Sequence, residues 1–73
     1  MTDVVDSDEL LRRMQRARTC ARQEEQAWRT RSFGLRSSDP EGARDARVRM
    51  LAYGAVLRVL DEILTPGTHP DEL

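Results

Sequence analysis

The stretch "SFGLRSSDPE", residues 32–41, divides the chain into two helical halves. Gly34 is typical of the position where a helix stops. Further on, Asp39, Pro40 and Glu41 supply an N-cap residue, a proline at the first helical position and an acid behind it. This is the strongest helix-start signal in the chain. We therefore expect one helix on each side of the break, over residues of about 7–31 and about 40–64.

The half before the break has the pattern of an amphipathic helix. Asp6 is placed to act as the N-cap, and Glu9, three positions later, completes a variant of the capping box. From there to Gly34 neither glycine nor proline interrupts the chain. Apolar residues recur at steps of three and four, which is the spacing of one helical face. The resulting seam is Leu10, Met14, Ala17, Ala21, Glu24 and Trp28, with Glu24 as its polar member.

The half after the break carries a matching seam, made of Ala43, Ala46, Met50, Tyr53, Leu57, Leu60 and Leu64. Folding the chain at the loop places Trp28 opposite Ala43 and Leu10 opposite Leu60, while Glu24 meets Arg47. Large side chains then face small ones, as interdigitating layers require. The sequence predicts an all-α fold, an antiparallel two-helix hairpin. Its expected core is Leu10, Met14, Ala17, Ala21, Trp28, Met50, Tyr53, Leu57, Leu60 and Leu64.

A second apolar stripe on the later helix has no partner within the hairpin. Between Arg49 and Arg58 no residue is charged. The stripe points away from the seam, and a contiguous exposed patch of this kind usually marks an interface. Its residues are the predicted oligomer interface: Val48, Ala52, Ala55, Val56, Val59 and Ile63.

A second copy of the chain is the simplest cover, because two-fold dimers are the commonest oligomers. Two hairpins then form a four-helix bundle with coiled-coil packing. Acids gather near the termini and arginines near the loop, which favours an antiparallel arrangement. A different protein with a matching groove is the rival partner. Scattered surface apolar residues, or a tail folded over the stripe, are the remaining alternatives.

Chain length also favours association. Seventy-three residues make one domain, with a helical hairpin over 1–65 and a flexible C-terminal tail over 66–73. A single core of this size supplies only about 3–5 kcal/mol. Cys20 is the sole cysteine, so an internal disulfide is excluded. Cys20 and His69 are too few and too far apart for a zinc site.

The sequence indicates no catalytic machinery. The only histidine, His69, falls in the tail, and Cys20 is expected to be a partly buried structural thiol. The adjacent acids Glu24–Glu25 and Asp61–Glu62 diverge on a helix instead of converging on one site. No glycine-rich phosphate loop is present. We expect no enzymatic activity, no catalytic residues, no cofactor and no metal.

The distribution of arginine keeps a second function open. All twelve basic residues are arginine, which indicates a GC-rich coding sequence such as that of a high-GC bacterium or a phage. Net charge is −1, yet residues 12–36 hold eight arginines against two acids. The side chains of Arg12, Arg16, Arg22 and Arg29 would line one face that contacts phosphates or a further protein. Arginine-mediated nucleic-acid binding is therefore the alternative function.

The chain has the character of a small cytoplasmic protein. No apolar run approaches the roughly 20 residues that a membrane span needs. The opening "MTDVVDSDEL" is acidic, whereas a signal peptide begins with a basic segment. The expected function is that of a non-catalytic, homodimeric protein-interaction module, acting as an adaptor, regulator or inhibitor.

Overall fold

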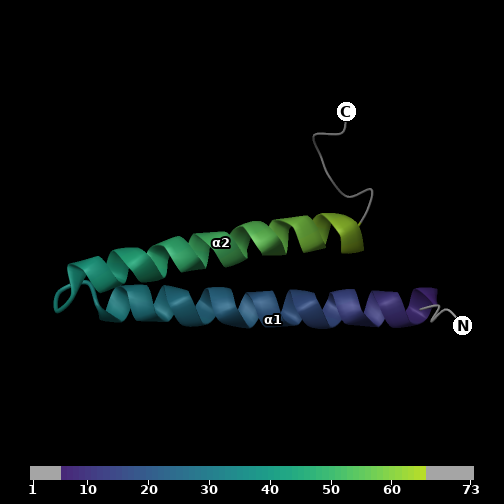
Figure 1. Ribbon diagram of the computed structural model, residues 1–73, viewed down its shortest axis with the longest axis horizontal. Helices are drawn as coiled ribbons and strands as arrows, with labels where there is room; N and C mark the ends of the chain where they lie inside the picture. Colours follow the sequence, from purple (N-terminus) through teal and green to yellow (C-terminus); the bar gives the residue numbers. More distant parts are fainter. Residues whose placement is uncertain (1–5, 66–73) are drawn as a thin grey trace, which may run out of the picture.

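The computed structural model describes residues 6–65, which form two helices packed side by side as an antiparallel hairpin (Figure 1). Helix α1 spans Ser7–Gly34 and helix α2 spans Pro40–Leu64. A loop over residues 35–39 joins them. The predicted all-α two-helix fold is confirmed. The predicted tail over 66–73, with His69, lies outside the described residues.

Both helices begin at the residues that the sequence indicates. Asp6 Oδ1 accepts a hydrogen bond of 2.7 Å from the backbone N–H of Glu9. Asp39 Oδ1 accepts one of 3.1 Å from the N–H of Gly42, directly after Pro40 and Glu41. At its other end α1 continues to Gly34, three residues beyond the expected 31, and Leu35 follows as its C-cap in the αR conformation.

The interior of the hairpin is built from alanines. Within residues 6–65, Ala21, Ala43 and Ala46 are the buried apolar residues, and Ala46 is only 1% exposed. Small side chains at a contact let two helices approach closely. The larger seam residues are mostly, but not fully, buried. They are Met14, Trp28, Met50, Tyr53, Leu57, Leu60 and Leu64. The hairpin by itself therefore covers most of each large seam side chain but encloses none of them fully.

The register of the two helices differs from the predicted one by about one turn. Ser32 Oγ donates a hydrogen bond of 3.1 Å to the carbonyl oxygen of Ala43. Trp28, which was predicted opposite Ala43, instead has the guanidinium of Arg49 above its ring, 5.0 Å from the centroid. The shift follows from the longer α1, because a helix that continues to Gly34 begins its pairing with α2 later in the chain.

Two residues of the predicted hairpin core, Leu10 and Ala17, are exposed instead. Arg18 Nη1 lies 3.5 Å from Asp61 Oδ1, only three residues before the last residue of α2. The first turns of α1 consequently project past the end of α2 (Figure 1). Leu10 is 46% exposed because α2 does not reach it. Ala17 is exposed since α1 is rotated so that Arg18, half-buried, takes its place against α2.

Candidate interaction surfaces

The outer face of α2 carries a continuous apolar surface. All six residues of the predicted oligomer interface are exposed, and Leu51 joins them. At about 100° per residue, they lie on roughly the opposite side of α2 from Ala43 and Ala46. The five large side chains among them are between 46% and 61% exposed. We call this set the outer stripe: Val48, Leu51, Ala52, Ala55, Val56, Val59 and Ile63.

Charged groups frame the outer stripe without entering its centre. At one end Arg49 Nε lies 3.3 Å from Asp45 Oδ2. Towards the other end, Arg58 and Glu62 border a shallow groove of about 470 Å³, whose apolar lining is Ala55, Val59 and Ile63. An apolar strip with a polar rim is the usual anatomy of a protein–protein contact.

Sequence reasoning missed Leu51, although it is 54% exposed. Leu51 lies three positions after Val48 and four before Ala55, which is the spacing of neighbours on one helical surface. Leu51 lies at the edge of the second apolar stripe, so dividing the helix into a seam and a second stripe assigned it to neither. Its exposure widens the outer stripe on the side of Arg58.

The predicted arginine face of α1 is divided by ion pairs. Arg12 and Arg16 both form ion pairs with Glu9, with nitrogen–oxygen distances of 3.1 and 3.8 Å. Arg29 pairs with Glu25, one turn away. Arg22 makes no ion pair within residues 6–65. Since each residue turns the helix by about 100°, Arg22 and Arg29 also point to a different side from Arg12 and Arg16.

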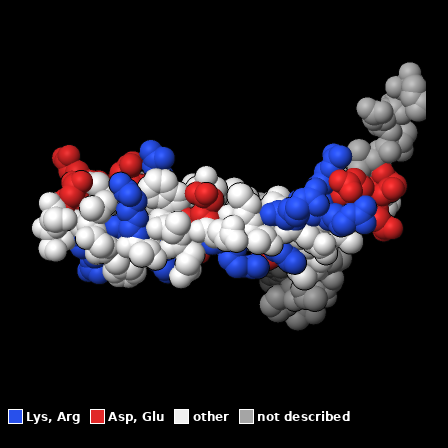
Figure 2. Space-filling model, turned by 90° about the horizontal axis from the view of Figure 1, so that it is seen from below, with Lys and Arg blue, Asp and Glu red and all other residues white. Residues whose placement is uncertain are grey.

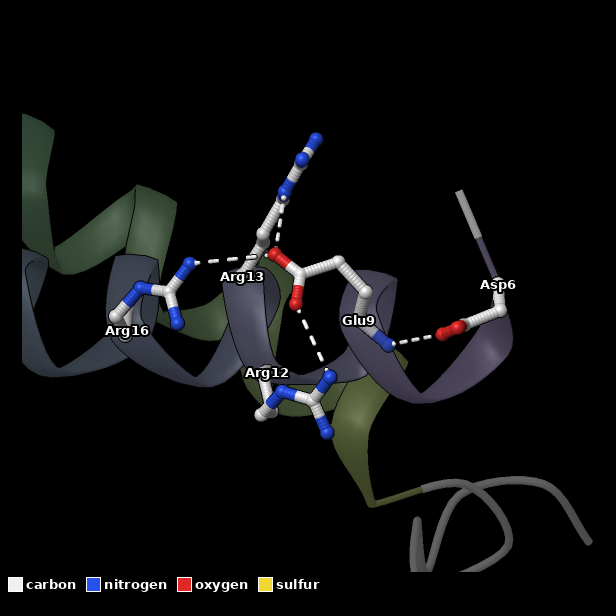
Figure 3. Close-up of polar contacts among 5 residues, drawn as sticks. All are labelled: Asp6, Glu9, Arg12, Arg13 and Arg16. Carbon is white, nitrogen blue, oxygen red and sulfur yellow. Dashed lines mark hydrogen bonds and ion pairs between the residues drawn. The ribbon is translucent and has the colours of Figure 1, made fainter. Parts of the chain in front are cut away.

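Glu9 is the centre of the arginine cluster at the start of α1 (Figure 3). Its carboxylate accepts hydrogen bonds from Arg13 Nε at 3.0 Å and Arg12 Nη2 at 3.1 Å. These bonds, together with the charge of Arg16, hold the pKa of Glu9 below its ordinary value. Since the carboxylate points towards these arginines and away from the Asp6 N–H, the capping box is only half formed. Figure 2 shows acidic and basic side chains mixed at this end.

Trp28 joins the two helices near the loop. The guanidinium carbons of Arg31 in α1 and Arg49 in α2 lie 5.9 and 5.0 Å from the centroid of its ring. Its Nε1 donates to Glu24 Oε1 at 3.2 Å. The predicted register placed Glu24 opposite Arg47, but its hydrogen-bond partner in the structure is Trp28. The partly buried Trp28 therefore stabilises the contact between the two helices of the hairpin.

Cys20 is exposed, in contrast to the partly buried thiol expected from the sequence. It lines a shallow groove on the outer side of α1, together with arginine, glutamine and threonine side chains. Among residues 6–65, no three His, Cys, Asp or Glu side chains gather as metal ligands would. Over the same range, neither helix combines the length and apolar character needed to cross a bilayer.

A third groove, of about 580 Å³, lies beside the loop where α1 ends and α2 begins. The sequence did not indicate it, because its lining comes from both helices and the loop. Four arginines surround it: Arg29, Arg36, Arg44 and Arg47. We call it the loop groove.

Comparisons with protein-family models, with curated proteins and with solved structures gave no match to this chain. Its function therefore has to follow from the chemistry of the outer stripe and of the grooves that lie on the two helices.

Proposed function

We propose that the protein is a non-catalytic interaction module that works as a homodimer, in which the outer stripes of two hairpins pack together as a four-helix bundle. The observation that carries the proposal is the row of five large apolar side chains, each about half exposed or more, on the face of α2 that α1 does not cover. A patch of this length on a small chain is typical of an interface.

The thin interior of the hairpin supports the same conclusion. Only alanines are buried among residues 6–65, whereas ordering the chain costs about 1–2 kcal/mol for each residue. Burying the exposed half of a valine or leucine recovers about 1 kcal/mol. In a two-fold interface both copies bury the same five large side chains. The ten side chains together contribute about 10 kcal/mol of favourable free energy, from which the cost of association has still to be subtracted. Packing the outer stripes of two copies together thus removes from water apolar surface that the hairpin alone leaves exposed.

Charge favours an antiparallel arrangement of the two copies. The loop end carries Arg31 and the four arginines of the loop groove against the three acids Asp39, Glu41 and Asp45, so a parallel dimer would bring two ends with excess positive charge together. An antiparallel dimer places the loop of one copy near Asp6 and Asp8 of the other. Exposed pairs of this kind contribute at most about 1 kcal/mol each, so they select the orientation and the outer stripe supplies the affinity.

The experiment compares two alanine-to-aspartate variants by light scattering and analytical ultracentrifugation. Ala55 lies in the outer stripe and Ala27 on the outer side of α1, and both are exposed positions within a helix, away from its caps. Ala55→Asp buries a carboxylate in the proposed dimer and should shift the protein to monomer at tens of micromolar. Ala27→Asp makes the same chemical change and should leave the dimer intact.

Val59→Asp should reproduce the effect of Ala55→Asp, because Val59 is 60% exposed within the outer stripe. The melting temperature of the wild type should rise with protein concentration, as linkage to dimerisation requires. A wild-type protein that stays monomeric, or a dimer that survives both stripe variants, would overturn the proposal.

A further inference from the structure

The loop groove gathers positive charge from three parts of the chain. Arg29 comes from α1, Arg36 from the loop, and Arg44 and Arg47 from the first turns of α2. Among the lining residues, all of which lie within residues 6–65, there is no carboxylate. The remaining lining is Ser32, Phe33, Pro40, Ala43 and Met50.

The charge in the groove is largely uncompensated. Arg29 pairs with Glu25, but within residues 6–65 Arg36, Arg44 and Arg47 make no ion pair with a carboxylate. Bringing guanidinium groups together without acids costs energy in the folded protein, since like charges repel. An anion in the groove would remove that cost, and guanidinium groups bind phosphate oxygens through two parallel hydrogen bonds.

An exposed aromatic ring lies beside these arginines. Phe33 is 62% exposed, and the guanidinium of Arg36 lies over its ring, 5.3 Å from the centroid. Arginine groups for the backbone next to a flat ring for a base are the combination that binds single-stranded nucleic acid. An acidic peptide would satisfy the guanidinium groups and leave the ring without a stacking partner.

We propose that the loop groove binds single-stranded nucleic acid, with phosphates on Arg44, Arg47 and Arg36 and a base stacked on Phe33. Every lining residue belongs to one chain, so this binding does not depend on the homodimer proposed above. The ligand is recognised by its phosphodiester backbone and its bases, without a defined sequence.

The test uses the full chain and a fluorescently labelled oligothymidylate, with anisotropy measured over a series of salt concentrations. Wild type should bind at low salt, and log K should fall linearly with log salt. Arg44→Gln with Arg47→Gln should weaken binding by about tenfold or more. The salt slope should become shallower by about 1.4, since each phosphate that is no longer neutralised accounts for roughly 0.7.

The matched control is Arg12→Gln with Arg16→Gln, which removes the same two charges from a site outside the groove. It should change affinity by less than about threefold, because its arginines do not touch the bound strand. Phe33→Leu keeps an apolar side chain but removes the stacking surface, and should weaken binding by about fivefold or more. The same measurements on Ala55→Asp should show binding at least as tight as that of wild type, because the groove lies within one chain and a monomer loses only the nearby acids of the second copy. This result separates the proposal from dimerisation.

Four results would overturn the inference. The first is no binding by wild type at low salt. The second is equal weakening of binding by the two double variants, which would mean that the strand is attracted by the overall charge of the protein and not by the loop groove. The third is competition by polyglutamate as effective as by unlabelled oligothymidylate, which would mark the groove as a site for an acidic protein segment. Tighter binding of duplex than of single strand would likewise contradict the stacking role of Phe33.

Discussion

Ser32 of α1 donates its hydroxyl hydrogen bond to the backbone carbonyl oxygen of Ala43 in α2, at 3.1 Å. Ser32 is half-buried and Ala43 is buried, so the bond lies where water has little access. It also marks the register, since a shift of one turn would remove the hydroxyl from this carbonyl. The hydrogen bond thus helps to fix how far α1 is shifted along α2, through a serine that belongs to neither predicted seam.

Replacing this hydroxyl should weaken the hairpin measurably. Ser32→Ala is expected to lower the free energy of unfolding by about 1 kcal/mol, the usual net value of a hydrogen bond of this kind. Ser37→Ala, in the exposed loop, is the matched control and should change it by less than about 0.5 kcal/mol. The measurement is urea denaturation followed by circular dichroism at one fixed protein concentration. Equal effects of the two substitutions would contradict the role given to Ser32.

Two helical glycines should respond differently to replacement by alanine. A Cβ at Gly54 would meet only Arg58 Nη1 within 4 Å, at 3.9 Å. Gly54→Ala should therefore stabilise α2 by about 1 kcal/mol through the better helix propensity of alanine. A Cβ at Gly42 would come within 3.0 Å of the Asp39 carboxylate that caps α2. Gly42→Ala should lose that cap, a cost of about 1 kcal/mol that offsets the same gain.

Thermal unfolding of the two glycine variants, at equal concentration, tests this contrast. The melting temperature should rise for Gly54→Ala and stay level or fall for Gly42→Ala. If Gly54→Ala instead destabilised the protein, the open space beside Gly54 would be occupied by another chain in the assembly. Equal stabilisation by both variants would show that the Asp39 cap tolerates a methyl group.

The arginine cluster around Glu9 predicts a shift that can be measured directly. Hydrogen bonds from Arg13 and Arg12 lower the pKa of Glu9 in the folded protein. Because the folded pKa lies below the unfolded one, the associated stability is present above the unfolded pKa and is lost as pH falls through the folded pKa. An NMR titration of the Glu9 side chain should therefore give a midpoint below that of an unperturbed glutamate.

Arg13→Gln should raise the Glu9 midpoint back towards its ordinary value, because it removes the strongest of the hydrogen bonds. Arg22→Gln removes one charge from the same helix far from Glu9, and serves as the control that should leave the midpoint in place. A Glu9 midpoint that does not respond to Arg13→Gln would mean that the hydrogen bond does not persist in solution. The helix content should fall as Glu9 is protonated, and it should do so at a higher pH in Arg13→Gln than in wild type or Arg22→Gln.

Local signals in the chain anticipate much of the fold. Asp6 and Asp39 cap the two helices because each carboxylate can reach an N–H within its own first turn, and that requires only nearby residues. The exposed positions of Val48, Val59 and Ile63 follow from helical spacing. The end of α1 was anticipated less well, since Phe33 and Gly34 continue the helix although glycine usually stops one.

The sequence by itself determined two capped helices, their antiparallel order and the apolar outer face of α2, because periodicity and capping are local properties. Only the tertiary structure decided the register, and with it the exposure of Leu10 and Ala17 and the partner of Glu24. It also decided that Arg29, Arg36, Arg44 and Arg47 surround one groove. The physical reason is that each turn added to α1 before the loop moves every pairing with α2, and no short-range pattern records how far one helix slides along another.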